Sequence, residues 1–357
     1  MGARDDWSHL DTKSQAGMHS FPLIIAGFLT VLVWAYLLLA RGKFWKVANS
    51  AVGPNVSSLR RALVAVVIPA RNEADVVARC INSLVRQTCS ESIHIFLVDD
   101  FSCDNTVQAA REAANGFGKS ASLTVIACRP LPPGWTGKLW AVRAGIEAAS
   151  LLSPSSLLLT DADVVHAPHS IATLLETAES GSYDLVSITG KLECQTFAEK
   201  LLIPAFTFFF LMLYPPAWIA NSKRRTAGAD GGCVLIRPEA LAPAGSVESI
   251  RHEVIDDCSL ARMVKRSGGT LYLGVSNLTA SVRRYESFAQ IGRLISRTAF
   301  SQLRRSTVML LATLLGLTVT YVLPLALSFT VSPLPIPLGV LAWAIHGRLL
   351  CSCNQVL

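Results

Sequence analysis

Three pairs of carboxylates, each beside an apolar segment, are the residues best placed to do chemistry. They are Asp99 and Asp100, Asp161 and Asp163, and Asp256 and Asp257. The first two pairs closely follow the apolar runs 93–98 and 157–159, which are typical of buried parallel strands. Because ligands bind at the carboxyl ends of strands in open α/β sheets, we expect both pairs to face one crevice. Carboxylates at such a crevice indicate a metal and nucleotide site.

The elements that must position these carboxylates alternate between strand and helix. A strand over residues 65–68 precedes a helix rich in Ala, Val and Leu that runs to about residue 85, and the alternation continues to about residue 180. This order predicts a doubly wound α/β domain. The loop after the first strand contains no glycine and the chain has no Walker A loop, which argues against a dinucleotide or P-loop site.

Five short motifs occur in order along the chain: IPARNEA, VDDFSCDNT, GWTGKLWAVRAG, TDAD and IDDCSLA. In this order and spacing they resemble family 2 glycosyltransferases, which have the GT-A fold. The segments PPGWTGKLWA and RTAFSQLRR further resemble the membrane-bound subgroup often labelled hopene-associated glycosyltransferases. The resemblance covers roughly residues 64–310. It implies a Rossmann-like α/β GT-A domain with a mostly parallel sheet over residues 60–300, flanked by transmembrane helices.

The resemblance also implies a role for each acidic pair. Asp100 would read the donor nucleobase, and Asp161 would bind the ribose or an outer-shell water. Asp163 would ligate Mg²⁺ or Mn²⁺ bridging the donor diphosphate, which fits the preference of these ions for one or two carboxylates plus substrate phosphates. Asp257 is similar to the family's general base, which takes a proton from the acceptor hydroxyl during an inverting attack on the anomeric carbon.

Other positions are implicated by the same resemblance. Lys138 lies where the family often has a Gly-Lys pair and could meet the donor phosphates; a solvated lysine at a helix start is the alternative. Gly231 and Gly232 belong to a glycine-rich acceptor-side segment, although they could simply form a bulge. The remaining donor-side positions are Pro69, Asn72 and Glu73, and those on the acceptor or diphosphate side are Asp256, Gln290 and Arg293.

The segment around Gln290 and Arg293 matches a Gln-x-x-Arg motif of membrane-bound synthases, but Leu294 replaces the Trp that follows it in the family. That Trp borders the acceptor site in processive polysaccharide synthases, so its absence argues against chain elongation. Apolar residues at helical spacing, with arginines between them, predict a basic amphipathic helix over residues 283–305 that lies on an anionic bilayer surface.

Composition agrees with a membrane protein. Charged residues make up only 16% of the 357 residues, the mean hydropathy is +0.42, and the net charge is +7. No aromatic-basic motif for nucleic acid accompanies the basic excess, and the arginines cluster beside apolar spans, so we expect membrane phosphates rather than nucleic acid as the partner.

The membrane segments are expected on both sides of the catalytic domain. After an N-terminal tail (1–20), residues 21–40 form an uncharged apolar stretch long enough to span a bilayer, with basic residues after it that favour a cytoplasmic catalytic domain. A cleaved signal peptide is the alternative. Residues 307–331 predict a second span, and 332–357 an apolar tail of uncertain structure.

The apolar segment 201–220 is long enough to cross as well, but a crossing would place Asp163 and Asp257 on opposite sides of the membrane. We therefore expect an interfacial or re-entrant segment. The resulting hypothesis is an integral protein of the inner membrane that transfers a sugar, with inversion, from a nucleotide-sugar donor, expected to be UDP-linked, to a lipid-like acceptor. The alternatives are a processive polysaccharide synthase and a non-catalytic, degenerate membrane scaffold.

Overall fold

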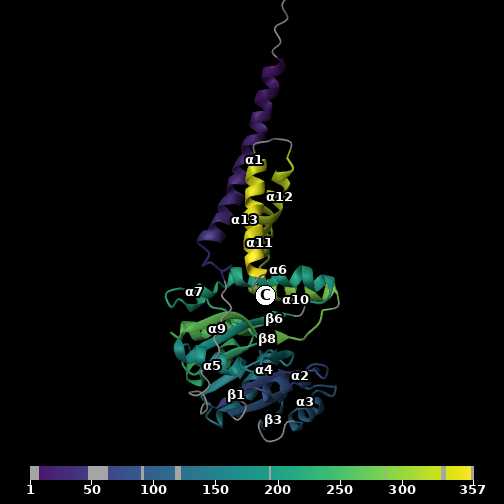
Figure 1. Cartoon of the computed structure of the whole chain (residues 1–357), viewed down its shortest axis with the longest axis vertical. Helices are drawn as coiled ribbons and strands as arrows, with labels where there is room; N and C mark the ends of the chain where they lie inside the picture. The colour runs from purple at the N-terminus through teal and green to yellow at the C-terminus, as the bar shows by residue number, and fades with distance from the viewer. Residues whose placement is uncertain are drawn as a thin grey trace, which may run out of the picture. The chain divides into compact units, whose positions relative to one another are not determined.

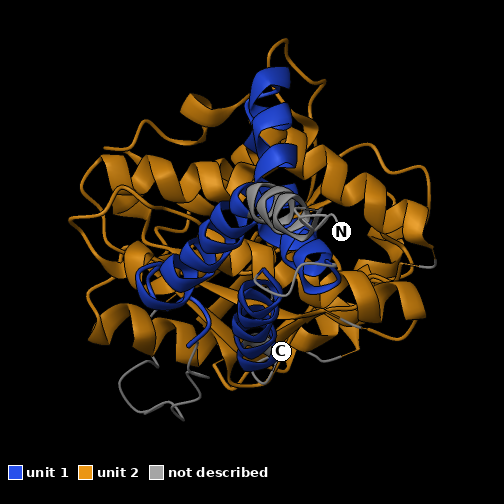
Figure 2. Cartoon of the chain, turned by 90° about the horizontal axis from the view of Figure 1, so that it is seen from above, with its two compact units in different colours: residues 1–46, 302–355 blue, residues 47–301, 356–357 orange. Residues whose placement is uncertain are grey.

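The structure is a computed structural model that divides the chain into two compact units, which are coloured separately in Figure 2. One unit comprises Met1–Lys46 and Gln302–Gln355, and the other comprises Val47–Ser301 and Val356–Leu357. The structure describes residues 8–46, 63–89, 92–116, 122–192, 194–285, 287–330 and 335–354.

The larger unit is built on one sheet. Its described strands are β1 (Val64–Ala70), β2 (Ile93–Asp99), β3 (Ser122–Ala127), β4 (Ser156–Leu159), β5 (Val164–His166), β6 (Leu185–Leu192), β7 (Val234–Ile236) and β8 (Leu271–Ser281). They form the order β3-β2-β1-β4-β7-β6-β8-β5. The first four strands in that order run parallel, and so do β6 and β8, while β7 and β5 are antiparallel to their neighbours. The carboxyl ends of β1, β2 and β4 therefore meet at one edge of the sheet.

Helices cover both faces of this sheet (Figure 1). The larger unit has two hydrophobic cores, one on each face of the sheet. Successive side chains of β1 point to opposite faces, so that Ala65 and Val67 are buried in one core and Val66 and Ile68 in the other. Side chains of α4 and α9 fill the first core, and side chains of α2 and α5 fill the second. These helices are α2 (Val77–Val85), α4 (Gly137–Ser150), α5 (Ser170–Ser180) and α9 (Asp256–Arg266), and the unit also holds α3 (Thr106–Asn115), α7 (Pro216–Ala220), α8 (Pro238–Leu241) and the 3₁₀ turn η3 (Val247–Ile250).

Two longer helices of the same unit, α6 (Phe197–Leu213) and α10 (Phe288–Gln302), begin beside each other. The rings of Phe197 and Phe288 pack edge to face, and the Tyr285 backbone N–H donates to Glu199 Oε1 at 2.7 Å. Glu199 also closes a capping box at the start of α6. The segment 201–220 consists of most of α6, the short link after it and α7. Both helices belong to the same compact unit as the sheet.

The basic helix expected over residues 283–305 is shorter than predicted. Because α10 begins only at Phe288, Arg283 and Arg284 precede it. Arg304 and Arg305 follow it in left-handed backbone conformations, with φ of +53° and +55°. The prediction was wrong for these four arginines because charge and apolar spacing alone do not mark where a helix starts.

The smaller unit contains α1 (Ser8–Leu39), α11 (Thr307–Leu317), the π-helical turn η4 (Thr318–Val322), α12 (Leu323–Ser328) and α13 (Ile336–Asn354). Two of its segments are apolar and long enough to cross a membrane: Phe21–Leu39, with a mean hydropathy of 2.3, and Thr307–Ser328, with 2.1. In the larger unit, Phe197–Ala220 meets the same criterion at 1.6. Residues 8–20, the described part of the expected N-terminal tail, form the first part of α1, and the expected C-terminal tail is helical over α13.

Candidate active site

The loops after β1 and β2 are joined by hydrogen bonds from backbone to side chain. The Asn72 N–H donates to Ser102 Oγ at 3.0 Å, and the Cys103 N–H donates back to Asn72 Oδ1 at 2.8 Å. The Glu73 N–H donates to Thr106 Oγ1 at 2.8 Å. Asn72 has φ +55°, a left-handed conformation that asparagine adopts more readily than most residues. These hydrogen bonds hold the loop that carries Glu73 against the loop that carries Asp100, the residue predicted to bind the nucleobase.

Asp100 is the first residue after β2 and lines a large crevice. Its Oδ2 is 3.5 Å from Arg71 Nη1. A Cβ at Gly137 would lie only 2.8 Å from the same oxygen, so the glycine allows the first turn of α4 to approach the carboxylate. Thr136 caps that helix by accepting a hydrogen bond from the Leu139 N–H. The amino end of α4 is thereby held at the crevice.

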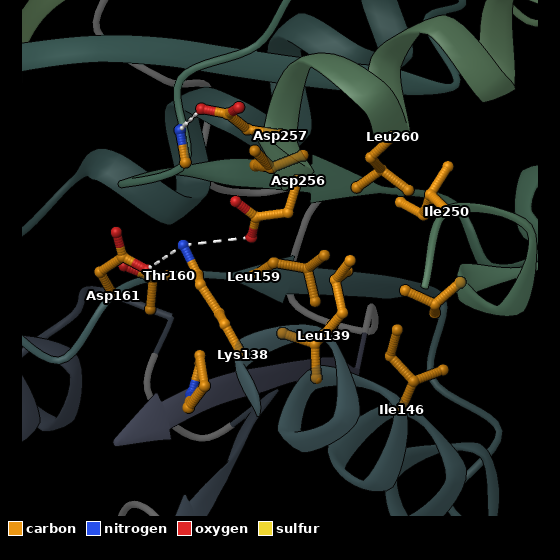
Figure 3. Close-up of a pocket in the computed structure, with 15 residues that line it drawn as sticks. Lys138, Leu139, Ile146, Leu159, Thr160, Asp161, Ile250, Asp256, Asp257 and Leu260 are labelled. Atoms are coloured by element: carbon orange, nitrogen blue, oxygen red, sulfur yellow. Dashed lines mark hydrogen bonds and ion pairs between the residues drawn. The ribbon is translucent and has the colours of Figure 1, made fainter. Parts of the chain in front are cut away.

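Lys138, in the first turn of α4, joins two of the acidic pairs (Figure 3). Its Nζ lies 2.8 Å from Asp161 Oδ1 and 3.2 Å from Asp256 Oδ2. The side chain is 40% exposed, so it stands in the open crevice and not in the core. Lys138 is thus a partly exposed lysine at a helix start, as one reading expected, and its ammonium is also paired with carboxylates from two distant parts of the chain. A contact with donor phosphates stays a prediction.

Asp257 is the second residue of α9 and accepts a hydrogen bond from the Gly231 N–H at 2.8 Å, drawn in Figure 3. A Cβ at Gly231 would lie 3.2 Å from Asp257 Oδ2, a tight contact, and 3.6 Å from Lys138 Nζ, so the glycine favours close approach of this backbone to the carboxylate. Burial, and then the neighbouring Asp256 charge, raise the pKa of Asp257 to about 7. A carboxylate with that pKa is suited to act as a general base near neutral pH.

Asp163 is buried and paired with an arginine. Its Oδ2 lies 2.7 Å from Arg283 Nε and accepts a hydrogen bond from Ser281 Oγ at 3.3 Å. The same guanidinium reaches Glu73, with Nη2 at 2.5 Å from Oε1. Sequence reasoning assigned Arg283 to a membrane-surface helix and missed this inward position.

The described part of the chain contains no cluster of three His, Cys, Asp or Glu side chains that could form a closed metal cage. The donor set nevertheless fits a hard cation, because Mg²⁺ and Mn²⁺ use one or two carboxylates and take their remaining ligands from phosphate and water. Asp163 already accepts from a cation, the Arg283 guanidinium. Asp161 and Asp163 both line the same crevice.

Most of the predicted site residues line one of two cavities, a large crevice and a small pocket. The crevice, of about 790 Å³, is lined by Pro69, Glu73, Asp100, Lys138, Asp161, Asp163, Gly232, Arg293 and Leu294, among others. A smaller pocket, of about 30 Å³, is lined by Gly231, Asp256 and Asp257, with apolar side chains from α4, α9 and η3 beneath them. Pro69, Lys138 and Asp161 line both cavities. Asn72 and Gln290 are not among the lining residues of either one.

Asp230 also lines the crevice and was missed from the sequence. Its N–H donates to Ser187 Oγ at 2.8 Å, and its Oδ1 accepts from the Gly232 N–H at 3.0 Å. Burial raises the pKa of Asp230 to about 6. The available signal was a carboxylate between glycines in GADGG, a sequence that also describes an ordinary turn.

Comparisons with known proteins identify the family and the fold. Residues 65–242 match the family model described as Glycosyl transferase family 2. A curated relative from Proteus mirabilis (strain HI4320), named undecaprenyl-phosphate 4-deoxy-4-formamido-L-arabinose transferase, is 32% identical over 175 residues, which are 48% of this chain and 47% of the relative. The chain thus spans about half the length of that relative.

Among solved structures, the mannosyltransferase from Pyrobaculum calidifontis in complex with GDP-Man and Mn²⁺ has a TM-score of 0.55 at 18% identity, covering 92% of this chain and 86% of that one. This likeness confirms the GT-A fold expected from the sequence, with helices on both faces of a mixed, mostly parallel sheet. Residues 65–242 therefore form a glycosyl transferase family 2 domain, and this domain has the GT-A fold.

Proposed function

We propose that the chain transfers a sugar, with inversion and with a divalent cation, from a nucleotide-sugar donor to a lipid-like acceptor at the cytoplasmic surface of the plasma membrane. One observation carries this proposal. Lys138 contacts Asp161, on the donor side, and Asp256, the immediate neighbour of the proposed base Asp257. This pairing supports the proposal, because it holds a residue assigned to the donor and the neighbour of the proposed base close together, and a single displacement needs both substrates close together.

Donor recognition is assigned to the loops after β1 and β2. The Asp100 carboxylate can accept a hydrogen bond from the ring N–H of a nucleobase, and we propose uracil as that base. Pro69, Glu73 and Lys138 line the crevice beside Asp100, where the rest of the donor would extend. Asp161 is assigned to the ribose or to a water in the outer shell of the cation.

Asp163 would hold Mg²⁺ or Mn²⁺ together with the diphosphate oxygens. When bound, such a cation acts as a Lewis acid that stabilises the departing nucleoside diphosphate. The proton transfer is assigned to Asp257 and does not involve the cation. The Gly231 N–H fixes one oxygen of that carboxylate at 2.8 Å, and the carboxylate would take the proton of the attacking hydroxyl.

The acceptor is proposed to be a lipid phosphate or a similar amphiphile. Arg293 and Arg297 of α10 line the crevice, and guanidinium groups bind phosphate oxygens with two parallel hydrogen bonds. The curated relative is named for undecaprenyl phosphate, which is consistent with this choice. An association with hopanoids rests on sequence resemblance alone.

Membrane association is supported by three apolar segments long enough to span a bilayer. Arg41, Lys43 and Lys46 follow the first of them and favour a cytoplasmic catalytic domain. Leu294 lines the crevice where processive synthases carry Trp, which favours the addition of one or a few sugars over polymer synthesis.

A panel of nucleotide sugars tests the donor assignment. Thermal unfolding of the detergent-solubilised chain with Mn²⁺ should show stabilisation by UDP-linked sugars, because a ligand that binds only the folded state raises the unfolding temperature. Asp100→Ala should remove that stabilisation, whereas Asp75→Ala, at an exposed carboxylate outside the crevice lining, should keep it. Stabilisation by GDP-linked sugars alone would contradict the choice of uracil, and stabilisation by none would contradict the donor site.

A further inference from the structure

Arg283 makes contacts that the transfer reaction itself does not explain. It follows the last residue of β8 by two positions and pairs with two carboxylates from elsewhere in the chain. Nε lies 2.7 Å from Asp163 Oδ2, and Nη2 lies 2.5 Å from Glu73 Oε1. One guanidinium thus ties the loop after β1 to the loop that precedes β5.

The exposure of the three side chains sets an order of depth. The Arg283 side chain is 44% exposed, whereas those of Glu73 and Asp163 are 19% and 11% exposed. All three side chains line the crevice. The Arg283 guanidinium therefore lies toward solvent, and the two carboxylates lie deeper. Burial raises the pKa of Glu73, and the hydrogen bond from Arg283 opposes that rise. The guanidinium therefore supplies positive charge to both carboxylates.

Asp163 does not depend on the arginine for its position. Ser281 Oγ also donates to its Oδ2 at 3.3 Å, and the Val282 N–H donates to its backbone carbonyl at 2.8 Å. The contact with Arg283 therefore contributes charge neutralisation more than anchoring. It also occupies Oδ2, one of the two oxygens that a divalent cation would use on Asp163.

We propose that Arg283 is an exchangeable counter-ion of the cation site: it neutralises Asp163 and Glu73 before the donor binds, and it passes to the donor diphosphate when a divalent cation takes Asp163. This inference rests on the proposed role of Asp163 as the cation ligand. The exchange is balanced at Asp163, because one positive partner replaces another. The guanidinium gains a phosphate with the nitrogens released from Asp163, and its Nη2 can keep the contact with Glu73. A planar guanidinium is suited to both partners, since its fork matches carboxylate and phosphate alike.

The exchange predicts effects of opposite sign on the two ligands. Arg283→Met keeps the apolar stem of the side chain but removes the guanidinium that competes with Mn²⁺ for Asp163. The affinity of the variant for Mn²⁺, measured without nucleotide, should therefore rise roughly fivefold. With saturating Mn²⁺, the affinity for UDP should fall roughly tenfold, because a charge-assisted bond to the diphosphate is lost. General damage to the site would weaken both ligands. Arg283→Lys keeps the charge without the fork and should fall between the wild type and Arg283→Met in both measurements.

The measurement is titration of the full chain in detergent, with calorimetry for UDP and electron paramagnetic resonance for Mn²⁺. Arg266→Ala removes one positive charge from an exposed position at the end of α9 and should leave both affinities unchanged. If the wild type binds no Mn²⁺ even with UDP, the proposed cation site itself is refuted. If it binds Mn²⁺ but neither arginine variant binds the metal more tightly, the counter-ion role alone is refuted. Thermal unfolding identifies a variant that fails to fold, in which case the other variant decides.

Discussion

Replacing Asp257 by Asn separates the chemical role of this residue from its structural role. The amide preserves the shape of the side chain and can still accept the hydrogen bond from the Gly231 N–H, which the carboxylate accepts at 2.8 Å. It cannot take a proton from the acceptor. Positioned acid–base groups contribute ~10²–10⁴-fold, so we expect transfer to fall by that factor with little change in donor affinity.

The same substitution should stabilise the protein at alkaline pH. Burial raises the pKa of Asp257 from 3.8 to about 7, so the folded state favours the protonated form. The cost of ionisation is absent below the unfolded value, grows as the pH rises from about 4 to about 7, and is complete above that range. The shift corresponds to roughly 4 kcal/mol, and solvent screening of this partly exposed side chain reduces the expected gain to roughly 2 kcal/mol.

The assay is thermal unfolding of the wild type and of Asp257→Asn at pH 8 and pH 4.5. A gain of about 2 kcal/mol corresponds to a rise of roughly 4–8 °C for a domain of this size, expected at pH 8 and nearly absent at pH 4.5. Asp75→Asn, at an exposed carboxylate, should show no such difference. A variant that is inactive but equally destabilised at both pH values would refute the account of a base whose ionisation is disfavoured in the folded state, and near-normal turnover would refute the base itself.

Three further predictions follow from the same geometry. The transfer rate should fall about tenfold between pH 8 and pH 6, because a base with a pKa of about 7 is protonated over that interval; a flat profile in kcat/KM would contradict the role of Asp257. Lys138→Met should weaken donor binding and shift the acid limb of kcat/KM to higher pH, because the lysine charge lowers the pKa of Asp257; an unmoved limb would show that the bridge does not act on the base. Cysteines introduced at Ser180 and Ser222, on either side of α6, should both be labelled from the cytoplasm, and opposite accessibility would refute the interfacial reading of that helix.

Much of the fold could be predicted because its elements are local and strongly apolar. The strand expected over residues 65–68 lies within β1, and the run 93–98 lies within β2. Both strands are almost entirely buried, so their composition alone marks them. The acidic residues that follow β2 and β4 could be placed at one edge of the sheet, because neighbouring parallel strands end at the same edge.

The pairings within the site could not be predicted because they join distant residues. Nothing local to Lys138 indicates that its partner is Asp256, more than a hundred positions later. Arg283 resembles its arginine neighbours in sequence, and its pairing with Asp163 and Glu73 becomes visible only in the structure. Asp230 was overlooked because a carboxylate between glycines is typical of turns, and the hydrogen bond that holds it, from its N–H to Ser187 of β6, joins residues that are distant in the sequence.

The most direct test of the central claim follows the sugar itself. Membranes containing the full chain should be incubated with Mn²⁺ and a labelled nucleotide sugar, and the products extracted into organic solvent. We predict that the label enters a small glycolipid and that Asp257→Asn abolishes its formation while Asp75→Asn does not. Label found only in a water-soluble polymer of high molecular weight, or a glycolipid that forms equally well with Asp257→Asn, would contradict the proposed reaction.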